Sequence, residues 1–164
     1  MNLSLKKRST LSGISVLCLN NDSDQIVGDP YPLDGMETNN LEIDYKYRLK
    51  GEKWGCIRTD LLKLRFFPII RGFHFPESWL WYYFSKKFKV ISFNKPLRRY
   101  YTSETGITQH ELRKNNDPSQ ARVNIKFYTW LLSRNGLYIL RHHPRSFIQS
   151  CKIIVNSMIT LNKR

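Results

Sequence analysis

Residues 73–101 read FHFPESWLWYYFSKKFKVISFNKPLRRYY, and this stretch has the clearest secondary-structure pattern in the chain. Pro76 suits the first turn of a helix, because the N–H that proline lacks would have no intrahelical partner there. The predicted apolar helix face consists of residues at near four-residue spacing: Leu80, Trp81, Phe84 and Phe88. Residues 89-KVISFN-94 then predict a strand that Pro96 ends. The stretch therefore predicts a helix followed by a strand.

Short apolar runs separated by turn residues precede this stretch. Residues 14-ISVLCL-19 and 25-QIVG-28 flank a turn cluster and predict a β-hairpin. Residues 29–44 are rich in Pro, Gly, Asn and acids, which predicts an irregular loop. Residues 46–58 alternate weakly around a glycine and predict another extended pair, and 59-TDLLKLRFF-67 predicts a short helix.

The chain after residue 101 is predicted to be a polar loop over 102–120 and then helical. Pro144 separates a helix over 121–133 from a last amphipathic helix. The apolar face predicted for that helix consists of Phe147, Cys151, Ile154, Met158 and Leu161. Its predicted polar face consists of Arg145, Gln149, Lys152 and Asn156. This order of elements predicts an α/β fold that is part of a larger domain, followed by helices.

Composition narrows the class of protein. Of 164 residues, 27 are Lys or Arg and 13 are Asp or Glu, which gives a formal charge of +14. The 13% of aromatic residues argues against a disordered basic tail, and no apolar run reaches the roughly 18 residues of a membrane span. We read no signal peptide at the N-terminus. Three widely separated cysteines fit a reducing cytoplasm, where they would serve as small apolar fillers.

The charge is unevenly distributed. Residues 21–60 hold nine acids and five bases, whereas residues 121–164 hold eight bases and no acid. Nucleic acid, an anionic membrane and a phosphate-bearing substrate would each suit such a surface. The chain has no helix-turn-helix, zinc-finger or RNA-recognition signature, which argues against nucleic acid.

Four segments together carry a resemblance to a known family. They are 12-SGISVLCLNNDSDQIVGDPYP-32, 51-GEKWGCIRTDLLK-63, residues 73–101 and Thr108. In their order and spacing they resemble the C-terminal half of a family 2 glycosyltransferase of the GT-A type. The resemblance implies a partial GT-A-like mixed sheet with flanking helices and a C-terminal helical tail. The resemblance divides the chain into a basic N-terminal segment over 1–11, a GT-A-like half-domain over 12–120 and a basic helical tail over 121–164.

The resemblance implies a role for Glu77. An inverting transferase needs a carboxylate that removes the proton of the acceptor hydroxyl, and Glu77 stands where the family has this general base. The alternative is that Glu77 is an ordinary acidic residue at a helix N-terminus. Weaker candidates for contact with an acceptor are Lys53, Trp54, Arg98, Arg99 and Tyr101. A core tryptophan and solvated arginines are the alternative interpretation of this weaker group.

The resemblance also implies what this stretch of sequence lacks. Complete family members bind a nucleotide-sugar through an N-terminal half in which a D-x-D carboxylate pair holds Mg²⁺ or Mn²⁺. Asp22-Ser23-Asp24 has that form, but its neighbours are typical of a turn, so we predict no metal ligand and no cofactor in this chain. The expected function is therefore hexosyl transfer from a nucleotide-sugar to a glycan or lipid-linked acceptor, with the chain inactive alone. Two origins are open for such a chain: a decayed or frameshifted gene, or a half that pairs with a separate donor-binding chain.

A second hypothesis belongs to another class of protein. The acid-free last helix, residues 145–161, is also typical of a non-catalytic basic protein that lies on a membrane surface. Core helices with one solvated side show the same amphipathicity. Either hypothesis predicts a cytoplasmic chain, with peripheral contact to the inner face of the membrane.

Overall fold

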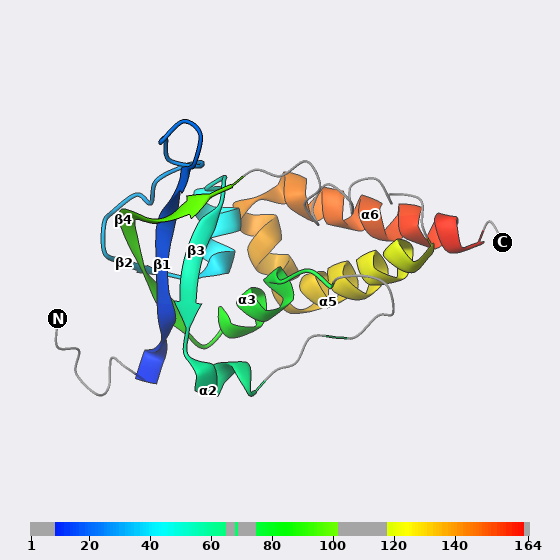
Figure 1. Ribbon diagram of the computed structural model, residues 1–164. Coiled ribbons are helices and arrows are strands. Elements are labelled where there is room, and N and C mark those ends of the chain that lie inside the picture. Colours follow the sequence, from blue (N-terminus) through cyan, green and yellow to red (C-terminus); the bar gives the residue numbers. More distant parts are fainter. Residues whose placement is uncertain (1–8, 65–67, 69–74, 102–117, 163–164) are drawn as a thin grey trace. The chain divides into compact units, whose positions relative to one another are not determined.

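The computed structural model describes residues 9–64, 68, 75–101 and 118–162, and these form two compact units. The sheet unit comprises residues 9–64 and 80–101, and the helical unit comprises residues 68, 75–79 and 118–162. Figure 1 labels their elements. In chain order they are β1 (Leu11–Asn20), β2 (Met36–Thr38), the π-helix η1 (Glu42–Tyr47), β3 (Lys53–Ile57), α2 (Thr59–Leu62), α3 (Ser78–Phe84), β4 (Lys89–Tyr100), α5 (Pro118–His142) and α6 (Pro144–Asn162).

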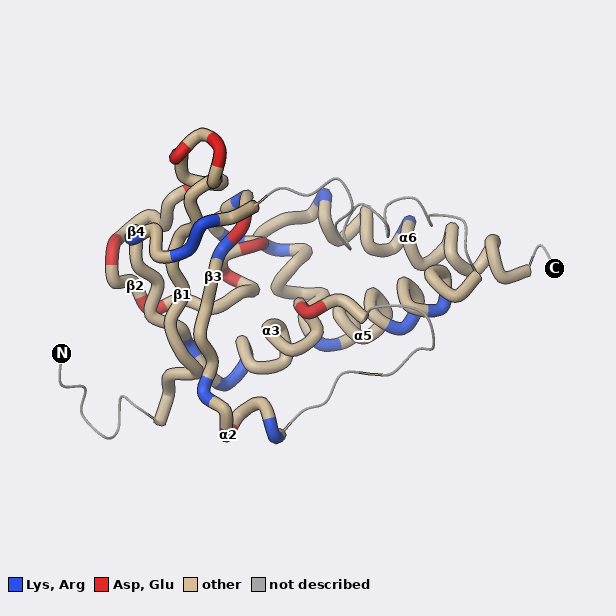
Figure 2. The backbone as a smooth tube through the Cα atoms, viewed as in Figure 1, with Lys and Arg blue, Asp and Glu red and all other residues tan. Residues whose placement is uncertain are grey.

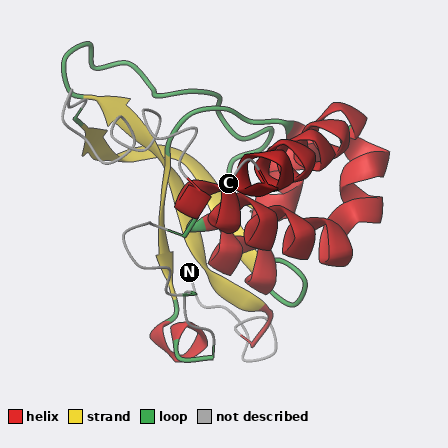
Figure 3. Cartoon of the chain, turned by 90° about the vertical axis from the view of Figure 1, so that its right-hand side faces the viewer, coloured by secondary structure: helices red, strands yellow, loops and turns green. Residues whose placement is uncertain are grey.

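The sheet unit is built on one mixed four-stranded sheet with the order β2-β4-β1-β3. Figure 3 shows its strands in yellow. The central strand β1 pairs in parallel with β4 and antiparallel with β3, while β2 pairs antiparallel with the other side of β4. The predicted α/β class, with a mixed sheet and C-terminal helices, is therefore confirmed at this level.

The predicted strand over residues 14–19 is the middle of β1. Val16, Leu17 and Cys18 are consecutive and almost completely buried. Because successive strand side chains point to opposite faces, a run of buried residues means that both faces are covered. On the face of Leu17 the core contains Tyr31, Ile43, Met36 and Leu49.

The expectations for residues 25–58 need correction. Ile26 makes a single antiparallel bridge with Leu19, so residues 25–28 are not a return strand. The predicted loop over 29–44 contains β2 and the start of η1. Within 46–58 only Lys53–Ile57 is extended, and it pairs with β1. The apolar patterns indicate extended chain here, but which strands pair with one another depends on residues far away in sequence.

Pro96 does not end β4, contrary to the prediction. Val16 is opposite Phe93 and Leu17 is opposite Pro96, so the two intervening residues form a bulge in β4. A bulge is one of the few places where a sheet accommodates proline, because the ladder needs no N–H there. The Asn94 backbone N–H instead donates to Asp34 Oδ1 at 2.7 Å.

The predicted helix after Phe75 forms as α3, but it begins at Ser78, so Pro76 precedes it. Leu80 and Phe84 are buried as expected, while Phe88 lies beyond the end of the helix. The predicted helix over 59–67 is shorter in the described residues, where α2 spans Thr59–Leu62. Residues 65–67, most of 102–120 and most of 1–11 lie outside the described residues.

The helical unit consists mainly of α5 and α6. His143 separates them in sequence, and the two helices pack against each other. The fully buried side chains of α6 are Ser150 and Ser157, whereas the predicted apolar face is only partly buried and its Met158 is 48% exposed. Phe147 of that face packs on α5, because a Cβ atom on Gly136 would lie 3.4 Å from the Phe147 ring.

An aromatic cluster completes the helical unit. The Trp79 and Trp130 rings lie 4.0 Å apart between centroids, and Phe75 meets Phe127 edge to face at 6.0 Å. These contacts tie residues 75–79 to the first half of α5. Within the described residues, no helix combines the length and the hydropathy that a membrane span requires.

Candidate functional site

The candidate site is a group of half-buried and buried polar side chains in the sheet unit, the Asp44–Lys53 cluster, which comprises Asp44, Lys53, Tyr31 and Tyr82. The π-helix η1 positions Asp44. Asn39 Oδ1 accepts the Glu42 backbone N–H at 3.0 Å, which fixes the start of η1. The η1 segment ends at Arg48, whose left-handed backbone (φ 57°) turns the chain toward β3.

Asp44 is held in place by a tyrosine from another element. Tyr82, which is buried in α3, donates its hydroxyl to Asp44 Oδ2 at 2.6 Å. Burial raises the pKa of Asp44 above its usual value, although this hydrogen bond and the charge of Lys53 oppose the rise. Burial likewise raises the pKa of Tyr82. The pair therefore favours a protonated carboxyl more than an exposed aspartate would.

Lys53 shows the opposite shift. It opens β3 opposite Leu17, and its ammonium donates to the Lys50 carbonyl at 2.9 Å. Burial lowers its pKa, although the charges of Asp29 and other nearby carboxylates oppose this. The same ammonium lies 5.9 Å from the centroid of the Tyr31 ring. Burial thus shifts both the acid and the amine of the cluster toward their neutral forms.

Tyr31 is the aromatic member of the cluster, and hydrogen bonds hold it in place. Its hydroxyl hydrogen-bonds with Ser15 Oγ at 2.7 Å on β1. Its backbone N–H donates to Asn94 Oδ1 at 2.7 Å, and Asn94 Nδ2 donates to the Tyr31 carbonyl at 2.9 Å. These two hydrogen bonds join the loop that contains Tyr31 to the bulge in β4. The ring beneath Lys53 is therefore held by three hydrogen bonds.

The arrangement has a definite chemical capacity. A carboxyl with a raised pKa and an amine with a lowered pKa both exchange protons more readily near neutral pH than their exposed counterparts. Each also binds hydroxyl or phosphate oxygens, the carboxyl as donor or acceptor and the ammonium as donor. The cluster is thus suited to hold a polar ligand at one end of the sheet.

The structure brings four of the sequence-predicted residues to that same end. Lys53 and Trp54 are opposite Leu17 and Val16 on one side of β1, and Arg98 and Arg99 are opposite Cys18 and Leu19 on its other side. Trp54 is half-buried, and both arginines are exposed. Arg99 also forms an ion pair with Asp24 at 2.5 Å.

Of the remaining two predicted residues, Tyr101 directly follows β4, at the strand end that carries Arg98 and Arg99, and is 68% exposed. Glu77 belongs to the helical unit, where it is exposed and directly precedes α3. The roles given to these residues by the resemblance stay predictions.

Sequence reasoning missed the acidic member of the cluster, because residues 29–44 were predicted to be loop. The available signal was 44-DYKY-47, a carboxylate among aromatic residues that ends three residues before the GEKW stretch begins. Tyr82 was read only as part of an aromatic helix. Nothing in its spacing indicates which carboxylate it contacts.

Asp22 and Asp24 form a turn, as predicted. Asn20 Oδ1 accepts the backbone N–H groups of Asp22 and Ser23 at 2.8 and 3.0 Å, which is an ordinary asparagine turn. Across the described parts of the chain, no three His, Cys, Asp or Glu side chains are grouped as metal ligands would be. Cys56 corrects another expectation, since it is exposed on β3 and is not an apolar filler.

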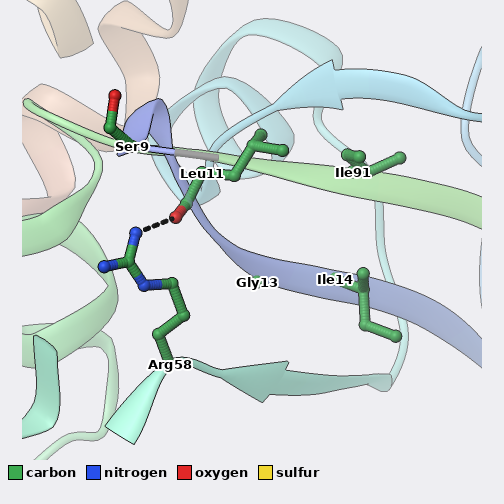
Figure 4. Close-up of a pocket in the computed structure, with 6 residues that line it drawn as sticks. All are labelled: Ser9, Leu11, Gly13, Ile14, Arg58 and Ile91. Atoms are coloured by element: carbon green, nitrogen blue, oxygen red, sulfur yellow. Dashed lines mark hydrogen bonds between the residues drawn. The ribbon is translucent and has the colours of Figure 1, made fainter. Parts of the chain in front are cut away.

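A separate shallow pocket opens at the other end of β1 (Figure 4). Its lining is mostly aliphatic and comprises Ser9, Leu11, Gly13, Ile14, Arg58 and Ile91. Arg58 already donates to the Leu11 carbonyl at 3.2 Å and is ion-paired with Asp60 at 2.6 Å. Because its one charged group is engaged, this pocket is the weaker candidate for a ligand site.

Compared with family models, curated proteins and solved structures, the chain matches none. The resemblance to family 2 glycosyltransferases therefore depends on the residues quoted for it.

Proposed function

We propose that this chain carries the acceptor-side half of an inverting family 2 glycosyltransferase, with Glu77 in the general-base position. The observation that carries the proposal is the order of elements around Glu77. An exposed carboxylate precedes α3, and the same stretch then enters β4, the parallel partner of β1. A general base must approach the acceptor hydroxyl to within hydrogen-bond distance, and an exposed carboxylate is accessible to one.

The Asp44–Lys53 cluster supports an acceptor role in the sheet unit. Sugar hydroxyls and phosphates are bound by ammonium groups, by carboxyl groups and by the faces of aromatic rings. Lys53 supplies the ammonium and Asp44 the carboxyl, while Trp54, the next residue of β3, has a half-buried indole on the opposite face of the sheet. Arg98 and Arg99 add positive charge on the neighbouring strand.

The donor side of the proposal is tested by calorimetry on the full chain. UDP-glucose and UDP-N-acetylglucosamine are titrated in the presence of Mn²⁺, and we expect no binding and no sugar transfer. The reason is that the sequence has no nucleotide-cradling βαβ turn and that its D-x-D forms a turn. Binding at millimolar concentration or tighter would contradict the proposal.

The acceptor side is tested by saturation-transfer NMR with N,N′-diacetylchitobiose and a short prenyl phosphate as probes. We expect contact with at least one probe and a weaker signal in Lys53→Met. Lys87→Met is the matched control, since Lys87 is an exposed lysine after α3. If neither probe gives a signal, or if both variants behave alike, this chain does not bind acceptors as proposed.

The role of Glu77 is tested where transfer can occur, with the chain co-expressed beside the donor-binding half of a family 2 enzyme. Removal of a general base lowers the rate by roughly 10²- to 10⁴-fold, which is the loss we expect for Glu77→Gln. Glu52→Gln, at another exposed glutamate, is the control. Equal rates for the two variants would exclude Glu77 as the base.

A further inference from the structure

The side of α6 that faces away from its buried residues is unusually apolar. Ile148, Val155 and Ile159 are 53%, 54% and 48% exposed. Their spacing of seven and four residues places them along one line of an α-helix. These three residues, with Lys152 between them, are called here the α6 outer face.

The α6 outer face is distinct from the surface that packs on α5. Ser150 and Ser157 are the buried residues of α6, and at 100° per residue they lie roughly opposite Val155. Half-exposed aliphatic side chains on that opposite side do not contribute to the packing of the two helices. They leave an aliphatic stripe about 17 Å long in contact with water, at 1.5 Å per residue.

The charge around this stripe has one sign. Residues 118–162 contain six Lys or Arg residues and no Asp or Glu. In Figure 2, the charged positions on α5 and α6 are all Lys or Arg, and none is Asp or Glu. Lys152 lies within the stripe, and Arg145 is exposed about one helical turn before Ile148, the first residue of the stripe. Such a surface repels a second copy of itself and attracts an anionic one.

We propose that the α6 outer face docks on an anionic lipid bilayer, with α6 lying in the plane of the interface. Aliphatic side chains enter the acyl boundary, and basic side chains on the same helix contact the negatively charged headgroups. This inference stands on the helical unit alone and does not depend on the proposed transferase function. Failure of either proposal leaves the other intact.

The test is flotation of the full chain with vesicles of phosphatidylcholine containing about 30% phosphatidylserine, compared with vesicles of phosphatidylcholine alone. Near 0.1 M salt we expect binding to the anionic vesicles only, and weaker binding at high salt because the surface charges are screened. Binding to both kinds of vesicle alike would contradict the proposal, as would binding to neither.

Variants locate the binding surface. Ile148→Ser combined with Ile159→Ser removes two aliphatic side chains from the interface and should weaken vesicle binding about tenfold or more. Leu137→Ser is the matched control, because Leu137 is 87% exposed on α5, outside the stripe. Circular dichroism confirms that each variant folds, which we expect because the replaced side chains are half-exposed or more.

The charge contribution is tested in the same way. Lys152→Gln should weaken binding about fivefold, the usual effect of one basic residue near a membrane surface. Lys126→Gln is the control, since it removes an equal charge from the exposed side of α5. If the variant Ile148→Ser/Ile159→Ser binds as tightly as the wild type, the attraction is electrostatic alone and the α6 outer face is not the docking surface.

Sedimentation of the chain without lipid tests another occupant of the stripe. A dimer in that experiment would assign the stripe to a second copy of the chain and contradict the proposal.

Discussion

Tyr82 donates its hydroxyl to Asp44 at 2.6 Å and so joins α3 to η1 across 38 residues of sequence. The tyrosine is buried and the carboxylate is half-buried, so this hydrogen bond gives each of them a polar partner inside the protein. Loss of one partner leaves the other under-satisfied in a region of low polarity. This contact connects the stability of the sheet unit with the acidic group of the candidate site.

We first predict how Asp44→Asn changes the dependence of stability on pH. Because the folded-state pKa of Asp44 is raised, its contribution is fully present below about pH 4 and is lost as pH rises through the folded pKa. An asparagine does not ionise, so the free energy of unfolding of Asp44→Asn should rise relative to wild type between pH 4 and pH 7. Urea denaturation at several pH values measures this difference. Asp22→Asn, at an exposed carboxylate, should show no such trend.

Tyr82→Phe tests the same contact from the other side. The variant keeps the ring but removes the hydroxyl that Asp44 accepts. We expect a loss of about 1–2 kcal/mol in the free energy of unfolding at pH 7, since a half-buried carboxylate loses its hydrogen-bond donor. Tyr101→Phe removes an exposed hydroxyl after β4 and serves as the control. Equal stability of the two variants would show that the Asp44 contact contributes little.

The ion pair between Lys89 and Glu42 joins the start of β4 to η1, with Thr38 donating to the same carboxylate at 3.0 Å. Burial disfavours the charged form of Glu42, but the hydrogen bonds from Lys89 and Thr38 outweigh it and lower its pKa. The stability that this shift provides is present above the unfolded pKa of about 4 and is lost as pH falls through the folded pKa.

We therefore predict that Lys89→Met lowers the free energy of unfolding by about 1–2 kcal/mol at pH 7, a value between exposed and buried pairs. The difference from wild type should be smaller near pH 3 than at pH 7, because the stability that depends on ionised Glu42 is lost as pH falls through its lowered, folded-state pKa. Denaturation at the two pH values, with Lys87→Met as the exposed control, measures it. A difference that does not change with pH would mean that Lys89 acts through packing of its aliphatic stem.

Gly28 and Gly51 meet backbone to backbone beside Lys53. A Cβ atom on Gly51 would lie 2.4 Å from the Gly28 Cα, and Gly51 has a φ of +82°. Gly51→Ala should therefore lower the free energy of unfolding by about 2–4 kcal/mol, since strain and steric overlap add. Gly35→Ala shares the positive φ, but its Cβ atom would make only an ordinary contact with Phe93 Cε1 at 3.7 Å, and a loss of about 1 kcal/mol is expected there. Thermal denaturation of both separates steric overlap from backbone strain, and equal losses would rule out the overlap.

Asn20 holds the turn that contains Asp22 and Asp24 through two backbone hydrogen bonds. We predict that Asn20→Ala lowers the free energy of unfolding by about 1 kcal/mol. Asp22→Asn should change it by less than about 0.5 kcal/mol. Mn²⁺ should leave the melting temperature of the wild type unchanged. A rise in melting temperature with Mn²⁺ that Asp22→Asn abolishes would make this turn a metal site.

Local sequence patterns identified the elements better than their partners. Residues 14–19 are apolar enough to predict a strand, and Pro144 marks the boundary between two helices. Pro96 was misread because a local rule assumes an unbroken ladder, whereas the bulge in β4 depends on Tyr31 and Asp34. The predicted apolar face of α6 is only partly buried, because which side of a helix is covered depends on its partner. Two serines of α6 are buried, while Ile148, Val155 and Ile159 stay exposed.

The sequence by itself determined the mixed α/β composition, the acid-free helical tail and the glutamate that precedes α3, since these follow from composition and local periodicity. Only the tertiary structure decided that Asp44 meets Tyr82, that Lys53 and Arg98 flank β1, and that Ile148, Val155 and Ile159 face outward. Each of these depends on contacts between residues distant in sequence. Burial and pKa shifts arise from such contacts, so no local pattern of residues contains them.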